Sequence, residues 1–178
     1  MQIIRPGSVL FTHYNGSILS EAIEQVEKLE VKSAFYPSHA LICIDQGICV
    51  EAAEKGIAEC SPAKYYYDPK ETVIAKIPKG LNADSLFKIR TFAMAHLGDN
   101  YDYLGLLLGI PVERVLAWLK LMNSNEGLML HQRNSFVCSA FVSACLQAAF
   151  PTSPFFKNRN IEQVDPAQLY QAFEWEAE

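Results

Sequence analysis

The chain has 178 residues, half of them hydrophobic, and a formal net charge of −5. This length allows one substantial hydrophobic core, so we expect a single domain spanning residues 1–178. The acidic balance and the absence of a basic run argue against a nucleic-acid partner. Arg5, Pro6 and Gly7 interrupt the first residues, where a secretory signal would need a continuous apolar stretch, so we expect a cytoplasmic protein.

The cysteines favour a reducing compartment. They are odd in number and lack the paired spacing of a disulfide scaffold. A zinc site built from Cys43, Cys49, Cys60 and His39 is an alternative, but these spacings match no standard ligand pattern. We therefore expect no metal and no cofactor.

The first half of the chain predicts strands around one helix. Turn residues 5–8 precede a strand at 9–12, and residues 17–30 have the apolar spacing of an amphipathic helix. Residues 39–44 and 48–52 predict a β-hairpin, and 65–67 and 72–77 predict two further strands. Sequential neighbours would make the sheet antiparallel.

The second half predicts helices. One begins at Asn82 or Asp84 and ends near Leu97, before a glycine suited to the left-handed cap. Residues 103–122 are strongly apolar, but glycines, charges and Pro111 interrupt them, which indicates a helix restarted at the proline and no stable membrane span. A loop at 123–133, a helix at 135–149 and a short terminal helix after Asp165 and Pro166 complete the chain.

The loop of the hairpin decides whether His39 and Glu51 can meet. A three-residue loop at 45–47, with its glycine in the left-handed conformation, places Leu41 opposite Glu51. His39 then shares that face, diagonal to Glu51 at about 7–8 Å between backbone positions. A two-residue loop at 46–47 would send the two side chains to opposite faces. Glu51 is the charged residue of an apolar strand, so a buried carboxylate there needs a partner such as His39.

Cys138 follows much later in the chain. Asn134 or Ser135 is a suitable helix cap, which places Cys138 in the first turn, where unpaired N–H groups and the helix dipole favour a thiolate and can stabilise an oxyanion. Cys145 lies on the same helix face but deeper, as a core residue. The three residues match a triad of nucleophile (Cys138), base (His39) and orienting acid (Glu51).

Structural explanations compete with this triad. A single histidine at the start of an apolar strand, or a cysteine among apolar residues, is more often structural than catalytic when taken alone. His13 in a predicted turn, His96 at a helix end and His131 in a predicted loop are expected to be structural or exposed.

Short motifs occur along nearly the whole chain at residues 6–11 (Pro-Gly-Ser-Val-Leu-Phe), 38–40 (Ser-His-Ala), 50–52 (Val-Glu-Ala), 98–102 (Gly-Asp-Asn-Tyr-Asp) and 138–142 (Cys-Ser-Ala-Phe-Val). In these motifs and their order the chain resembles the circularly permuted NlpC/P60 papain-like proteins, the YiiX/YebB-like group. Ser8 stands where many relatives have an acidic residue, a departure that concerns the opening loop more than the triad.

This resemblance implies an α+β fold of the permuted papain-like kind, an antiparallel sheet packed against helices that include the cysteine-bearing one. It implies a cysteine hydrolase that cleaves an amide or ester through an acyl-thioester on Cys138, with His39 as base and Glu51 as orienter. Tyr101 and Ser139 are candidate substrate-binding residues. The implied substrate is a small peptide or amino-acid amide such as a cell-wall fragment.

Three alternatives stay open. A lipid acyl hydrolase or acyltransferase could use the same triad, with residues 104–122 as an acyl-chain groove in place of a buried core helix. A non-catalytic binding module could keep the triad on a repurposed scaffold. An assembly protein could use exposed aromatic surfaces at residues 65–67 and 155–156.

Overall fold

The structure, a computed structural model, describes residues 4–14, 35–53, 56–99, 127–157 and 159–177, apart from the side chains of residues 127–137 and 163. The predicted helix at 17–30 and the apolar segment 103–122 lie outside these ranges. Among the residues that are described, no helix has the length and apolar character needed to cross a membrane.

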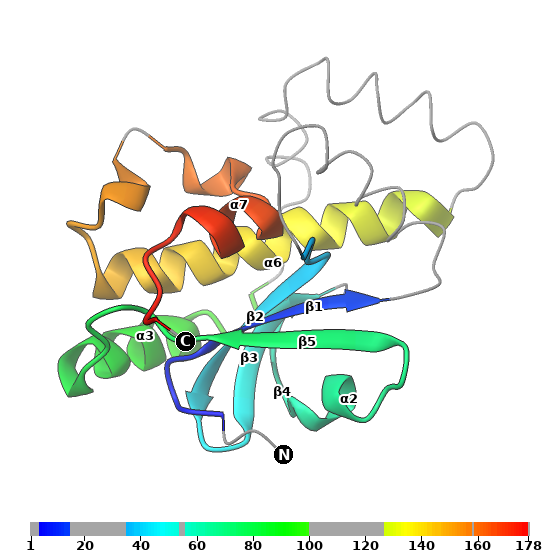
Figure 1. Ribbon diagram of the computed structural model, residues 1–178, viewed down its shortest axis with the longest axis horizontal. Helices are drawn as coiled ribbons and strands as arrows, with labels where there is room; N and C mark the ends of the chain where they lie inside the picture. Colours follow the sequence, from blue (N-terminus) through cyan, green and yellow to red (C-terminus); the bar gives the residue numbers. More distant parts are fainter. Residues whose placement is uncertain (1–3, 15–34, 54–55, 100–126, 158, 178) are drawn as a thin grey trace.

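An antiparallel sheet of five strands forms the centre of the described fold (Figure 1). In chain order the strands are β1 (Val9–Tyr14), β2 (His39–Asp45), β3 (Ile48–Ala53), β4 (Gly56–Cys60) and β5 (Glu71–Lys76). Their spatial order is β4-β3-β2-β1-β5, so the last strand returns across the sheet to pair with the first. The predicted α+β class and the antiparallel sheet are confirmed.

The strand predicted at residues 65–67 is wrong. Three consecutive tyrosines favour β-structure, which is why the sequence predicts a strand there. They instead belong to a helical turn, α2 (Ala63–Tyr66), with Tyr67 as its C-cap. The turn connects β4 at one edge of the sheet to β5 at the other, and it packs its tyrosines beneath the sheet.

The other helices of the described residues are α3 (Ala83–Ala95), α6 (Gly127–Ala149) and α7 (Pro166–Ala172), with short 3-10 turns at Pro154–Phe156 and Ile161–Gln163. Asn82 caps α3 as predicted, and its side chain accepts a hydrogen bond from the Ser85 backbone N–H at 3.0 Å. Gly98 adopts the predicted left-handed conformation after this helix, with φ of 84°.

The two faces of the sheet carry different cores. Helix α6 lies along one face, and α2 lies on the opposite side of the sheet (Figure 1). Helix α7 packs on the same face as α6, where the ring of its Tyr170 lies 5.2 Å from that of Phe11 in β1. Phe141, Val142 and Leu146 of α6 are buried in the same cluster as Ile42 and Val50 of the sheet. The face toward α2 buries a smaller cluster, which consists of Leu10, Leu41, Cys43 and Cys49. Alternation along β2 therefore assigns its side chains to two different cores.

Candidate active site

The hairpin closes differently from the prediction but keeps the predicted register. Asp45 pairs with Ile48, so the loop is the two residues 46–47, and the expected three-residue loop is wrong. A bulge between Cys43 and Asp45 adds one residue to β2. Because of this bulge Ile42 pairs with Val50, the pairing that the longer loop would have required.

This register brings the predicted pair together. The Nε2 atom of His39 donates a hydrogen bond to the Oε2 atom of Glu51 at 2.8 Å. Glu51 is 4% exposed, and the side chain of His39 is 18% exposed. Since Glu51 occupies Nε2, the nitrogen Nδ1 is the one left for another partner, which is the division of roles expected for an acid that orients an imidazole.

Glu51 has two further donors, both from α2. Lys64 Nζ donates to Oε1 of Glu51, and the hydroxyl of Tyr65 donates to Oε2. Burial raises the pKa of Glu51, but hydrogen bonds and charges from His39, Lys64 and Tyr65 outweigh this effect and lower it to about 2. The carboxylate is therefore ionised at neutral pH although it is buried.

Cys138 approaches the pair from the other side of the sheet. It lies on α6, is fully buried, and its sulfur accepts a hydrogen bond from the backbone N–H of Ala40 at 3.4 Å. Ala40 directly follows His39 in β2, so the sulfur lies at the start of the strand that carries the imidazole. Three residues that are far apart in sequence thus meet at one end of β2.

The expected position of Cys138 within its helix is wrong. Helix α6 begins at Gly127, and Cys138 is in its interior instead of in a first turn capped by Asn134 or Ser135. Residues 128–133 include leucine, methionine, glutamine and arginine, which have high helix propensity, so the helix continues through the predicted loop. Within a helix the N–H of Cys138 bonds to the carbonyl four residues earlier, which leaves it unavailable to an oxyanion.

His39 supplies the electrostatic support that the helix start does not. Burial lowers the pKa of His39, but the charge of Cys138, a hydrogen bond with Cys138, and the contacts with Glu51 together raise it to about 10. A protonated imidazole next to sulfur stabilises the thiolate, the nucleophilic form of cysteine. The arrangement can therefore hold an imidazolium and a thiolate side by side.

Of the two residues proposed for substrate binding, the structure describes only Ser139. Ser139 is fully buried, and its hydroxyl donates to the carbonyl of Val164 at 2.6 Å, which ties α6 to the segment before α7. Tyr101 lies outside the described residues. A role for either residue toward a substrate stays a prediction.

The remaining cysteines form a row across three strands. Cys43 pairs with Cys49, and Cys49 pairs with Cys60. Burial raises the pKa of the Cys60 thiol, and a hydrogen bond with Cys43 together with burial raises that of Cys49. Among the described residues no group of histidine, cysteine and acidic side chains has the geometry of a metal site. Cys145 is buried in the core cluster, as predicted.

Two expectations about other side chains are corrected. His13 lies in β1, not in a turn, and its Nδ1 atom contacts the carbonyl oxygen of Tyr36 at 2.7 Å. Phe155 and Phe156 are 5% and 7% exposed and pack in the main core, so they do not form the surface suggested for an assembly protein. His96 pairs with Asp99 at 2.8 Å near the end of α3, and the side chain of His131 is outside the description.

Sequence reasoning missed Lys64, Tyr65 and Ala40 as parts of this site. Alternation could not reveal Ala40, because its contribution is a backbone N–H that becomes available only where α6 crosses the strand. Lys64 and Tyr65 were hidden by the wrong assignment of a strand. A signal did exist, since Ser61 and Pro62 precede them and proline favours the first turn of a helix.

Comparisons with protein-family models, with curated proteins and with solved structures give no match to this chain.

Proposed function

We propose that the protein is a cysteine hydrolase that cleaves an amide or ester through an acyl-thioester on Cys138. The observation that carries the proposal is the convergence on one strand end of a cysteine, a histidine and a buried carboxylate. Glu51 accepts from His39 at 2.8 Å, while the sulfur of Cys138 accepts from Ala40, the next residue along β2. The resemblance to circularly permuted NlpC/P60 proteins supports the same assignment.

The steps follow from the roles of the three side chains. The thiolate of Cys138 attacks the substrate carbonyl, and a C–S bond forms as the leaving-group bond breaks. The imidazolium of His39 gives its proton to the departing amine or alcohol and is left neutral. His39 then takes a proton from water, whose oxygen attacks the thioester. The C–S bond breaks, the acid product leaves, and the Cys138 thiolate is regenerated beside the imidazolium of His39. Glu51 keeps the imidazole oriented throughout.

A donor for the tetrahedral oxyanion is available on β2. The N–H of Ala40 already faces the sulfur, so it lies near the carbon that the sulfur attacks. When the sulfur becomes part of a thioester it is a weaker acceptor, and this N–H can turn to the neighbouring oxyanion. In this proposal Ala40 replaces the N–H of Cys138, which the helix interior occupies.

The substrate is proposed as a small peptide or amino-acid amide, with lipid acyl esters as the second class that the same chemistry accepts. The test incubates wild type, Cys138→Ala and Cys145→Ala with a muropeptide panel and a phospholipid panel. Intact-protein mass spectrometry then detects acyl adducts, and product analysis detects cleavage. Cys145→Ala is the matched control, since it removes the same atoms from the same helix away from His39.

We expect an adduct and cleavage products with wild type and Cys145→Ala, and neither with Cys138→Ala. The class of product identifies the substrate as peptide or lipid. Equal turnover by Cys138→Ala and wild type would exclude the mechanism, and the absence of adduct and products from both panels would favour a binding module.

A further inference from the structure

Helix α2 contributes two neighbouring side chains to the candidate site from the face opposite α6. Lys64 donates to one oxygen of Glu51 and Tyr65 to the other. The oxygen that accepts from Tyr65 also accepts from His39 at 2.8 Å. Both carboxylate oxygens thus accept hydrogen bonds, and Oε2 accepts one from His39 and one from Tyr65.

Lys64 and Tyr65 also contact each other, and Tyr65 contacts His39. The ring of Tyr65 lies 5.8 Å from the imidazole ring, at an interplanar angle of 38°. The Nζ atom of Lys64 lies 4.6 Å from the centre of the Tyr65 ring. Tyr65 therefore fixes the acid through its hydroxyl and borders the base with its ring, while Lys64 holds both Glu51 and Tyr65.

We propose that Lys64 and Tyr65 are positioning residues that keep Glu51 ionised and aligned with His39. The role as stated rests on the proposed hydrolase function, because Glu51 acts on a reaction only through the imidazole. Although α2 is only one turn long, it presents two adjacent donors to a carboxylate that the sheet has buried.

Burial explains why Glu51 needs both donors. An ionised carboxylate in an apolar environment is disfavoured unless charged or hydrogen-bonded partners compensate for lost water. His39 alone supplies one hydrogen bond. Lys64 adds a positive charge from a side chain that is 49% exposed, so that it stays partly hydrated. Tyr65 adds a neutral donor that remains a donor, because burial and the charge of Glu51 raise its pKa.

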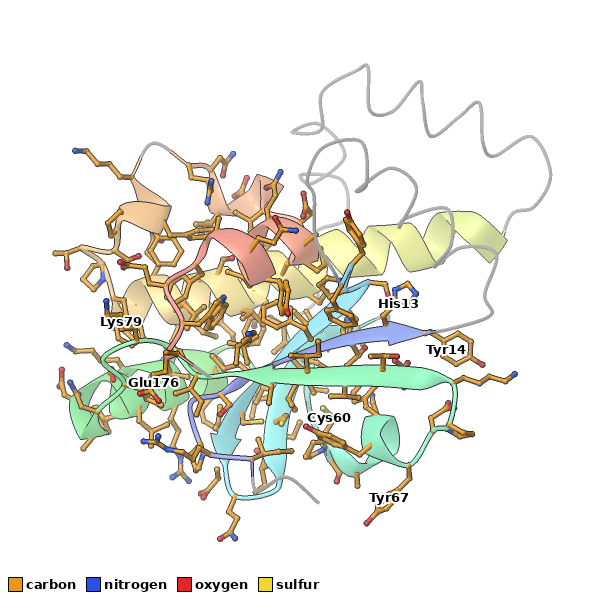
Figure 2. The ribbon with its side chains drawn as sticks, viewed as in Figure 1. His13, Tyr14, Cys60, Tyr67, Lys79 and Glu176 are labelled. Atoms are coloured by element: carbon orange, nitrogen blue, oxygen red, sulfur yellow. The ribbon has the colours of Figure 1, made fainter. Side chains whose placement is uncertain are left out.

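The test uses Tyr65→Phe and Lys64→Met, each with a matched control on the same protein. Tyr67→Phe removes a hydroxyl from a nearby tyrosine that is 75% exposed, and Lys79→Met removes an amine in the segment that follows β5. Figure 2 shows Tyr67 directed away from the sheet and Lys79 near Glu176, far from α2. Lys64→Arg restores the charge and serves as the conservative rescue.

The first measurement is the carbon-13 NMR titration of the Glu51 carboxyl between pH 3 and pH 6, which does not depend on turnover. Wild type and both controls should show a carboxylate that does not titrate in this range. We expect the Glu51 pKa to rise by about one unit or more in Tyr65→Phe and in Lys64→Met, as the loss of a charge-assisted bond requires. Lys64→Arg should resemble wild type.

The second measurement is the rate of Cys138 alkylation by iodoacetamide at pH 7, expected to fall about tenfold in the two variants and to stay unchanged in the controls. A purely structural role for α2 would lower the melting temperature without moving the Glu51 titration, and that result would overturn the proposal. If the titration moves while no substrate is cleaved by wild type, the positioning of Glu51 stands and the hydrolase proposal fails.

Discussion

The backbone N–H of Ala40 points at the sulfur of Cys138, 3.4 Å away, across a separation of 98 positions in the sequence. This contact joins the central helix to the strand that carries His39. It also explains how a cysteine in a helix interior can still have a donor for its thiolate. The N–H comes from the sheet instead of from the helix start.

Cys138 should react with iodoacetamide before Cys60, although Cys60 is partly exposed and Cys138 is buried. Burial and the charge of Glu51 raise the pKa of the Cys60 thiol, whereas Cys138 has His39 beside it as a base that can take the proton of the thiol. Mass-spectrometric mapping of the modified peptides over time at pH 7 measures the order. Faster labelling of Cys60 would show that access of the reagent, and not ionisation of the thiol, determines the order in which the cysteines react.

Replacing the base should remove this reactivity. In His39→Gln the side chain keeps a polar group but carries no charge, so we expect the alkylation of Cys138 at pH 7 to slow by about tenfold to a hundredfold. His96→Gln is the matched control, because His96 pairs with Asp99 at the surface near α3. Similar rates in wild type and His39→Gln would contradict an imidazolium-thiolate pair.

Glu51→Ala should lower the free energy of unfolding by about 3 kcal/mol, since it removes one partner of a buried ion pair and leaves His39 without its acceptor. Urea denaturation at pH 7 gives the value. Glu59→Ala is the control from β4, at a position that is exposed in that strand. A loss below about 1 kcal/mol would mean that the carboxylate contributes little to the fold.

The stability that Glu51 supplies should depend on acid pH. Its pKa is lowered from 4.5 to about 2 in the folded protein, so its contribution is complete above 4.5 and is lost as pH falls toward 2. The difference in unfolding free energy between wild type and Glu51→Gln should therefore narrow over that interval. A difference that stays constant from pH 6 to pH 2.5 would contradict the lowered pKa.

The stabilisation that His39 supplies should change with pH in the opposite direction. Its pKa is raised from 6.5 to about 10, so the stabilisation is fully present below 6.5 and disappears as pH rises through about 10. Urea denaturation of wild type and His39→Gln at steps between pH 6 and pH 10.5 should show converging stabilities. Parallel curves over this interval would mean that the imidazole is neutral in the folded protein.

Gly47→Ala should destabilise the protein by about 1 kcal/mol through the turn alone. Gly47 has φ of 74°, a conformation that disfavours a side chain, yet an added Cβ would meet no atom within 4 Å. Gln46→Ala, at the exposed neighbouring position, is the control. Thermal melting of both variants measures the effect. An unchanged melting midpoint for Gly47→Ala would contradict the left-handed conformation of this residue.

The sequence by itself determined the hairpin and one register that places His39 and Glu51 on the same face, but it left a second register open. Alternation has a period of two, and a left-handed glycine near the loop narrows the possible registers. The predicted register is correct, but the loop is not: a bulge before Asp45 and a two-residue turn give the same pairing as a three-residue loop. The alternation of the two strands predicted which residues could face each other, while the bulge, which the alternation does not reveal, gave that register to a two-residue turn.

Only the tertiary structure decided what surrounds this pair. The approach of Cys138 to Ala40 depends on how α6 packs across the sheet, and the contacts of Lys64 and Tyr65 depend on α2 passing beneath it. No local sequence pattern predicts such contacts. The segments come together because distant elements bury apolar surface against one another. The sequence therefore determines the chemistry that each side chain can perform, and the fold determines that these side chains meet at one end of β2.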